Sequence, residues 1–339
     1  MKTDGLDMNS HTCDTSSGDG SITSSNVDST ASGTPLRINS FDFETTGKDP
    51  TTARVWQFAT LSSSRANSLS LSINPQEIIP KEVQDLCHLD DTKLPAIYAS
   101  PTFGEVAGQL TDSLRNCDVL ISYNGEEYDI SVLNHELARC GMPTVTLPPH
   151  IDVLILGREF WPDLPSHSLV NLYKALAPND TWLQHILKEQ HIDLEANAHG
   201  AMFDCALEMC ILKLMVYQMN YAVGSIRVTR QAGEPLTMEH VRGLIQMQRV
   251  FAALQKQDAM LFGVAMLEGA WFKWLRTCRG CLGEGCNACE GVGAVMHTKK
   301  KRGQPVRKGY AKWALSGETF DVGTLPVAVR QVFQNVAER

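Results

Sequence analysis

The chain has 339 residues and a formal net charge of −8, with 43% hydrophobic and 20% charged residues. This length suits two ordered domains, and no apolar run approaches the roughly 18 residues of a membrane span. The first residues lack the apolar segment of a secretory signal. We therefore expect a cytoplasmic protein with reduced thiols and no membrane partner.

The charge is distributed unevenly. Residues 273–312 hold ten Lys or Arg and two acids, a charge of +8 that leaves −16 for the rest of the chain. This short C-terminal stretch is therefore the part we expect to contact a polyanion.

The N-terminal half begins with a segment, 1–36, that is rich in Ser, Thr, Gly and Asp. Its few apolar side chains predict a disordered tail. Strands are then expected at 38–44, 55–62 and 69–73, with short turn-rich joints that favour antiparallel pairing.

A second group of elements mixes helices with one buried strand. The expected strand is 119–122, and the expected helices are 81–89, 102–116, 128–140, 168–176, 181–190 and 201–217. Strands first and helices after, with one late buried strand, predict an α/β layer architecture.

The C-terminal region begins after a turn-rich segment, 218–235, which we interpret as a linker between domains. Residues 236–339 would form a second region. A helical stripe of apolar residues covers 238–254, and the apolar segment 259–274 is expected to pack against it.

Two carboxylates mark the end of the first strand. Asp42 and Glu44 are two residues apart, so they share one face, while Phe41 and Phe43 point into the opposite layer. Two neighbouring carboxylates repel each other unless a cation lies between them, and hard divalent ions prefer oxygen ligands. The alternative is a solvated strand end, because Asp-x-Glu is a common tripeptide.

Further acidic residues follow at two other points of the chain. Asp129 lies where a strand leads into a helix, and Asp204 lies in the first turn of a strongly apolar helix. An unpaired Asp in such apolar surroundings would be costly to bury. His199 is expected on the loop just before that helix, close to the same site.

In order and spacing, these motifs resemble the DnaQ-like (DEDDh) family of 3′-to-5′ exonucleases. The matching segments are Asp42-x-Glu44 with Thr45-Thr46-Gly47, the stretch from Asn124 to Asp129, and His199-x4-Asp204. The resemblance covers about residues 37–217. It implies an RNase H-like fold, with a mixed five-stranded sheet flanked by helices.

The resemblance also implies roles for the site residues. Asp42, Glu44, Asp129 and Asp204 would bind two Mg²⁺ or Mn²⁺ ions, and His199 would be the general base that takes a proton from water. Phe43, Thr45, Thr46 and Asn124 would contact the substrate. The spacing of the second motif departs from the pattern, since three residues separate Asn124 from Tyr128, as in the proofreading domains of family B polymerases. Asp152 is interpreted as structural.

Four cysteines crowd into the C-terminal region, in an eight-residue unit that occurs twice. They are Cys278, Cys281, Cys286 and Cys289. Each Cys-x-x-Cys can present two thiolates to one ion, so the pattern predicts a structural Zn²⁺ site, with an iron–sulfur cluster as the lesser alternative. The unit resembles the CxxCxGxG repeat of DnaJ-type chaperones, but no His-Pro-Asp signature of a J-domain is present.

A basic segment follows the cysteines. Its cations are Lys299, Lys300, Lys301, Arg302, Arg307 and Lys308. Tyr310 and Trp313 lie close by in the sequence, and cations mixed with aromatic rings suit phosphate contact and base stacking. The alternative is a solvated basic loop.

Together these features predict a metal-dependent 3′-to-5′ exonuclease with a zinc-containing nucleic-acid-binding region. Single-stranded DNA ends are the favoured substrate. Two alternatives stay open, an exoribonuclease and a non-catalytic zinc-dependent binding protein on a nuclease-like scaffold. The sequence does not identify a polymerase or a replication or repair partner.

Overall fold

The computed structural model describes residues 35–64, 68–177, 181, 185, 200–268, 275–277, 279, 294–296 and 304–305. At 257, 259–268, 275–277, 294–296 and 304–305 it describes the backbone alone. Several predicted features lie outside these residues. They are most of the N-terminal tail, His199, the four cysteines of the predicted zinc site and the six cations that follow them. Within the described ranges, no helix is both long and apolar enough to span a membrane.

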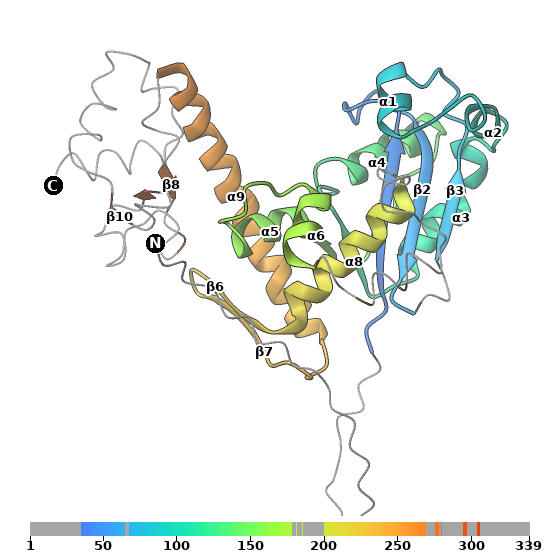
Figure 1. Cartoon of the computed structure of the whole chain (residues 1–339). Helices are drawn as coiled ribbons and strands as arrows, with labels where there is room; N and C mark the ends of the chain where they lie inside the picture. The colour runs from blue at the N-terminus through green and yellow to red at the C-terminus, as the bar shows by residue number, and fades with distance from the viewer. Residues whose placement is uncertain are drawn as a thin grey trace, which may run out of the picture. The chain divides into compact units, whose positions relative to one another are not determined.

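A five-stranded mixed sheet forms the centre of the fold (Figure 1). Its strands are β1 (Ile38–Thr45), β2 (Val55–Ser62), β3 (Leu69–Ser72), β4 (Val119–Ser122) and β5 (His150–Asp152), in the order β3-β2-β1-β4-β5. The first three strands pair antiparallel, as predicted, whereas β4 is parallel to β1 and β5 is parallel to β4. The predicted fold class is confirmed.

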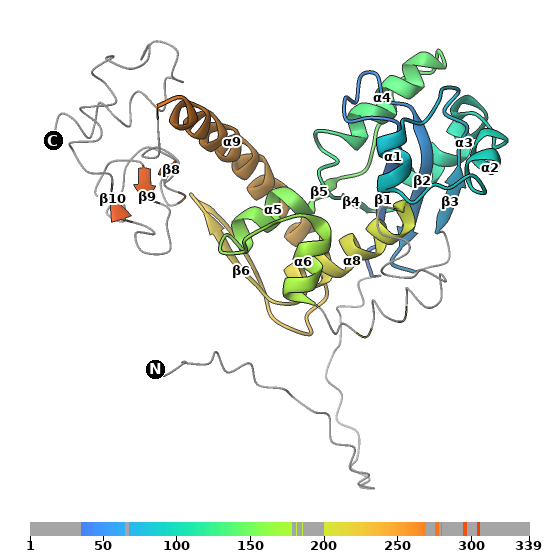
Figure 2. The same cartoon turned by 45° about the horizontal axis from the view of Figure 1, so that its top comes forward.

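Helices lie on both faces of this sheet (Figures 1 and 2). The described helices of the chain are α1 (Lys81–Leu86), α2 (Leu94–Tyr98), α3 (Phe103–Arg115), α4 (Asp129–Arg139), α5 (Val153–Phe160), α6 (Leu169–Leu176), α8 (Ala201–Tyr217) and α9 (Met238–Glu268), of which α9 contacts the sheet at β5 and then extends away from it. The sequence analysis missed α2 and α5, which are only five and eight residues long. Of the helix expected at 181–190, only Thr181 and His185 are described, and both are helical.

One face of the sheet packs against α3 and α4. Phe41 and Phe43 of β1 point into this layer, where both rings are buried with Leu110 of α3 and Leu133 of α4. The alternation of β1 therefore sends Asp42 and Glu44 to the other face, as their two-residue spacing predicted.

The other face packs against α8, whose buried residues surround the helix. This apolar character follows from its position, since α8 contacts β1 and β2 on one side and α5 and α6 on others. A helix that is apolar on all sides is one buried on all sides.

The segment 218–235, predicted as a linker, instead contains a β-hairpin. Its strands are β6 (Met219–Val223) and β7 (Ile226–Arg230), and the turn between them contains Gly224 with φ +55°. Met219 and Val223 are buried on β6, as is Val228 on β7, and β7 packs on α9. The Gly and Pro residues of the segment hid this period-2 pattern.

Helix α9 is a single element of 31 residues, whereas a second packed segment from residue 259 was predicted. Because the helix continues to Glu268, residues 259–268 extend the helix axis and cannot fold back on 238–254. No Gly or Pro interrupts α9 between Arg249 and Asp258, so the sequence offers no signal for a break there.

Three short strands lie in the C-terminal region. They are β8 (Leu275–Thr277), β9 (Ala294–Met296) and β10 (Gln304–Pro305), in the order β10-β9-β8. Thr277, which directly precedes Cys278, pairs with Ala294 in an antiparallel register. The two ends of the cysteine-rich segment are thus held next to each other.

Candidate active site

Three carboxylates from two elements converge at the end of β1. Asp42 and Glu44 leave β1 on the face covered by α8, and Asp204 lies in the first turn of α8. Among the described residues, these three offer carboxylate oxygens that all lie within 4.8 Å of one another. All three side chains are half-buried, so the cluster is set into the protein yet open on one side.

The position of Asp204 is set by the way α8 docks on the sheet. The N–H of Ala201, at the start of α8, donates to Gln57 Oε1 of β2 at 3.2 Å, and the Ser40 hydroxyl of β1 donates to the carbonyl of Cys205 at 2.9 Å. These two bonds hold the first turn of α8 across β1 and β2. Asp204 consequently faces Asp42 and Glu44.

Asp129 joins the site from the first residue of α4. Its Oδ1 accepts a hydrogen bond of 3.2 Å from the backbone N–H of Phe43, which lies between the two acids of β1. Asp129 is 3% exposed, so this bond gives a buried carboxylate one defined partner. The structure therefore brings together all four carboxylates that the sequence predicted.

Burial and mutual repulsion shift the ionisation of this group. The pKa of Asp42 lies well above its usual value, first because the side chain is buried and then because of Asp129 and Glu44. Burial and the charge of Asp204 likewise raise the pKa of Glu44. The pKa values of Asp129 and Asp204 rise to about 7, chiefly through burial. Burial is the largest cause of every shift, and repulsion between neighbouring acids adds to it at Asp42 and Glu44.

The donor set fits divalent cations. Oxygen-only ligands at half-buried positions suit Mg²⁺ or Mn²⁺, and bound cations would remove the repulsion that raises these pKa values. A phosphodiester would be repelled by several ionised carboxylates in the absence of cations. The geometry thus supports a metal site at Asp42, Glu44 and Asp204, with Asp129 adjacent.

Glu208 is a fifth acid at the site that sequence reasoning missed. It lies one helical turn after Asp204, is fully buried, and accepts a 2.8 Å hydrogen bond from the backbone N–H of Tyr123. Burial and the charges of Asp129 and Asp204 raise its pKa well above the usual value. The detectable signal was an isolated Glu four residues after Asp204 in an apolar helix.

Asp152 supports the turn that carries Asp129. Its carboxylate accepts backbone hydrogen bonds from Leu154 and Ile155 at the start of α5, and from Asn124 and Glu126 in the turn. The side chain is 1% exposed. This agrees with the interpretation of Asp152 as a structural residue.

The four predicted substrate contacts at this site differ in what they can offer. The Phe43 ring is buried against Phe58, with ring centroids 4.9 Å apart, and the Thr46 hydroxyl is occupied by Glu77 Oε1 and the N–H of Arg54. Direct contact of the Phe43 ring or the Thr46 hydroxyl with substrate is therefore corrected to a supporting role, because both groups are already packed or bonded.

Thr45 and Asn124 are more accessible. The Thr45 hydroxyl lies 2.5 Å from Tyr128 Oη and donates to the carbonyl of Gly47, so it links β1 to the turn before α4. Asn124 has a φ of +62°, and its side-chain amide makes no hydrogen bond within the described part of the chain. Asn124 can therefore offer its amide to a ligand.

The chain was compared with solved structures, curated proteins and protein families. Solved structures that resemble the chain include exonuclease I, in a study of how its processivity is achieved (17% identity, TM-score 0.40, covering 53% of this chain and 41% of that one). They also include the zinc-bound complex of E. coli exonuclease I with single-stranded DNA (17%, 0.39, 53% and 40%) and the E. coli enzyme with a dT13 oligonucleotide (17%, 0.38, 53% and 40%). The chain thus spans about two fifths of the length of these proteins.

No curated protein matches the chain. The sequence model of the RNase T exonuclease family matches residues 40–212, about half of the chain, and this range contains Asp42, Glu44, Asp129, Asp204 and Glu208. The chain therefore belongs to the RNase T family of exonucleases.

Proposed function

We propose that this protein is a metal-dependent 3′-to-5′ exonuclease that removes nucleotides from single-stranded DNA ends in the cytoplasm. The observation that carries the proposal is the convergence of Asp42, Glu44 and Asp204 within 4.8 Å, in a domain of the exonuclease family. Asp129, held by the N–H of Phe43, completes the set of acids.

The proposed site holds two Mg²⁺ or Mn²⁺ ions. Asp42 is the candidate for contact with both ions, because its carboxylate interacts electrostatically with Asp129 and with Glu44. When bound, such ions activate water, bind the scissile phosphate and stabilise the leaving 3′ oxygen. Glu44 and Asp204 would hold the ion on the side of the attacking water, and Asp129 the ion on the side of the leaving group.

His199 is proposed as the general base. It lies two residues before Ala201, where α8 begins, and it is outside the described residues. An imidazole with a pKa near neutral can accept the proton of the attacking water at physiological pH. A His199→Ala variant should retain metal binding and lose turnover, by about 10²- to 10⁴-fold.

The four cysteines are proposed to hold one structural Zn²⁺. The antiparallel pairing of Thr277 with Ala294 supports this, because it closes the segment that contains them. The basic residues from Lys299 to Lys308 would then grip the nucleic-acid backbone. Metal analysis of the purified protein should give about one zinc per chain, and Cys281→Ser should lower that content.

The experiment that tests the proposed activity uses a 5′-labelled oligonucleotide as single-stranded DNA, duplex DNA or RNA, with Mg²⁺ or Mn²⁺. We expect a stepwise ladder on single-stranded DNA. Asp42→Ala should reduce the rate by at least about 10³-fold, which corresponds to about 4 kcal/mol of transition-state stabilisation.

Other outcomes select the alternatives. A ladder on RNA alone would identify an exoribonuclease. No cleavage of any substrate, together with tight oligonucleotide binding that Cys281→Ser removes, would indicate a non-catalytic zinc-dependent binding protein. The chain retains every acidic residue of the exonuclease motif, and for that reason we favour the catalytic function over the binding function.

A further inference from the structure

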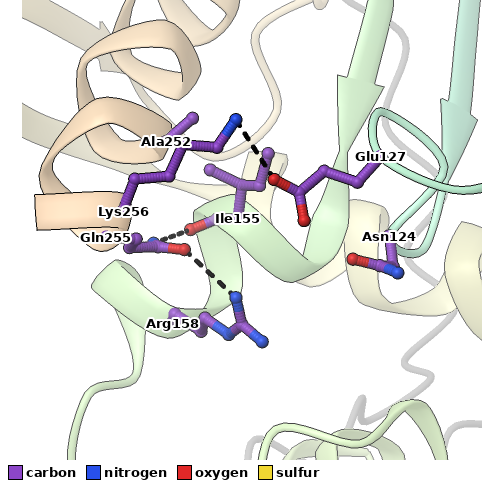
Figure 3. A pocket seen from close by; sticks show the side chains of 7 residues that line it. All are labelled: Asn124, Glu127, Ile155, Arg158, Ala252, Gln255 and Lys256. Carbon is purple, nitrogen blue, oxygen red and sulfur yellow. Dashed lines mark hydrogen bonds and ion pairs between the residues drawn. The ribbon is translucent and has the colours of Figure 1, made fainter. Parts of the chain in front are cut away.

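A cleft of about 150 Å³ lies next to the acidic site, between α5, α9 and the turn that precedes α4 (Figure 3). Its lining residues are Asn124, Glu127, Ile155, Arg158, Ala252, Gln255 and Lys256. Helix α9, which supplies three of them, begins at Met238, after the end of the family match at residue 212. This cleft is thus built partly by an element that lies outside the family match.

Two cations, Arg158 and Lys256, line the cleft, and both can bind an anion. Arg158 is exposed, and among the described residues its side chain makes one long hydrogen bond, 3.4 Å from Nη1 to Gln255 Oε1, although a guanidinium carries five donors. Gln255 is itself fixed, because its Nε2 donates to the carbonyl of Ile155 at 2.9 Å. The remaining donors of Arg158 are available to a ligand.

Lys256 forms an ion pair that an incoming anion can replace. Its Nζ lies 3.2 Å from Glu127 Oε1, and the two side chains are 69% and 59% exposed. An ion pair with this exposure contributes between 0 and about 1 kcal/mol, so a phosphate can take the place of Glu127 at little cost. Figure 3 shows this pair across the mouth of the cleft.

A third cation lies on the same face of α9. Arg249, Ala252 and Lys256 are spaced by three and four residues, so they share one side of the helix. The pKa of Glu126 is lowered first by its hydrogen bond to His150 and then by nearby charges that include Arg249 and Lys256. Both cations therefore face the turn that leads to Asp129.

Tyr123 joins the lining of the cleft to the acidic site. It directly precedes Asn124, and its backbone N–H donates a 2.8 Å hydrogen bond to Glu208, one helical turn after Asp204. Asp129 follows Glu127, a lining residue, by two positions. The cleft and the carboxylates are neighbours.

We propose that this cleft binds a backbone phosphate of the strand whose 3′ end enters the acidic site. Arg158 and Lys256 would contact the phosphate oxygens, and the Asn124 amide would add a donor. The proposal rests on the proposed exonuclease function. The cleft supplies the positive charge that the carboxylates lack. Phosphate contacts of this kind position a strand without reading its sequence.

The binding test compares two double variants, each also carrying Glu44→Gln to suppress hydrolysis. R158A/K256A removes the cations of the cleft, and R115A/K174A removes two exposed cations of α3 and α6 as a matched control. Affinity for a fluorescent single-stranded oligonucleotide is measured by anisotropy in Mg²⁺ at several salt concentrations. R158A/K256A should bind about 5- to 20-fold more weakly, with a salt slope reduced by about 1 to 2, whereas the control should stay within about twofold.

The kinetic test uses the protein without Glu44→Gln and adds a substrate with one phosphodiester, the p-nitrophenyl ester of thymidine 5′-monophosphate. R158A/K256A should lower kcat/KM for the oligonucleotide about tenfold more than for the ester, through KM, because only the oligonucleotide carries a second phosphate. Equal losses on both substrates would overturn the inference.

The two proposals can fail separately. If the wild-type protein cleaves neither substrate, the exonuclease proposal fails, and the anisotropy comparison still decides whether the cleft binds the strand. Unchanged oligonucleotide affinity in R158A/K256A overturns the inference while leaving the activity intact. Loss of inorganic-phosphate binding with unchanged oligonucleotide affinity would also overturn it, since the cleft would then hold a free anion.

Discussion

The backbone N–H of Tyr123 donates a 2.8 Å hydrogen bond to Oε1 of Glu208, and this bond joins the end of β4 to α8. The other carboxyl oxygen, Oε2, is buried and has no hydrogen-bond partner among the described residues. Burial and the charges of Asp129 and Asp204 raise the pKa of Glu208 well above its usual value, which favours the uncharged form of the side chain. The hydrogen bond to Tyr123 gives Glu208 a role in positioning the end of β4.

Replacement of Glu208 tests this role. Glu208→Gln keeps an oxygen for the N–H of Tyr123 and should change the free energy of unfolding by less than about 1 kcal/mol. Glu208→Ala leaves that N–H unpaired and opens a cavity, so it should cost about 2–4 kcal/mol. Urea denaturation of both variants measures the difference, and equal stability of the two would contradict the role.

Gly125 allows the turn before Asp129 to lie close to β4. A Cβ at this position would lie 2.0 Å from Ser122 Oγ and 2.7 Å from Ser122 Cβ, on a buried residue with little freedom to move. Gly125→Ala should therefore destabilise the protein by about 1–3 kcal/mol and reduce activity by displacing Asp129.

Gly108 provides the matched control for this substitution. It lies on an exposed side of α3, and a Cβ there would meet nothing within 4 Å. Gly108→Ala should stabilise the protein by about 0.5–1 kcal/mol, since alanine favours the helix. In thermal denaturation, Gly125→Ala should lower the Tm relative to the wild-type protein and Gly108→Ala should raise it. A higher Tm for Gly125→Ala would show that the turn is not tightly packed.

Asp152 should act through its hydrogen bonds, not through chemistry. Its Oδ1 accepts from Asn124, Leu154 and Ile155, and its Oδ2 accepts from Glu126. Asp152→Asn can retain the three bonds to Oδ1 and should preserve most activity. Asp152→Ala loses all four and should cost about 2–4 kcal/mol. The free energy of unfolding and the turnover number should fall in parallel across the two variants. An Asp152→Asn variant that is fully stable but inactive would instead assign Asp152 a catalytic role.

The raised carboxyl pKa values predict the pH dependence of stability without metal. Asp129 and Asp204 have pKa values of about 7 in the folded protein, against 3.8 ordinarily. Between about pH 4 and 7 the folded state therefore holds protons that the unfolded state releases. The free energy of unfolding should fall as pH rises through this window, by up to about 1.4 kcal/mol per pH unit for each group.

Thermal denaturation in EDTA at pH 5 and pH 8 measures this effect. We expect a lower Tm at pH 8, and a larger rise in Tm on addition of Mg²⁺ at pH 8 than at pH 5, because ionised carboxylates bind the cation. Asp204→Asn should reduce both effects. A Tm that rises from pH 5 to pH 8 in EDTA would mean that these acids ionise freely in the folded state.

Much of the exonuclease domain followed from local patterns. The period-2 spacing placed Asp42 and Glu44 on one face of β1, and the apolar surroundings of Asp204 predicted the need for a partner. Such signals are readable because each depends on a few neighbouring residues. The convergence of Asp42, Glu44 and Asp204 depends on the docking of α8 across β1, and therefore on contacts between residues distant in sequence.

Other features were hidden for the same reason. The cleft at Arg158 and Lys256 joins residues almost a hundred positions apart, and neither belongs to a motif. The β6–β7 hairpin was missed because Gly224 and Gly233 outweighed a short alternating pattern. Arg279 belongs to the basic stretch 273–312 that was expected to contact a polyanion, yet it pairs with Glu159 at 2.8 Å and Asp258 at 2.7 Å. Only the fold places its partners on α5 and α9.

The most direct test of the central claim compares the two ends of one substrate under single-turnover conditions. A single-stranded oligonucleotide is labelled at its 5′ end or at its 3′ end and incubated with protein and Mg²⁺, with Glu44→Gln as the control. We predict that the 3′ label appears at once as a mononucleotide, that the 5′ label shortens stepwise, and that both signals vanish in Glu44→Gln. Immediate release of the 5′ label, cuts within the strand, or cleavage unaffected by Glu44→Gln would contradict the account.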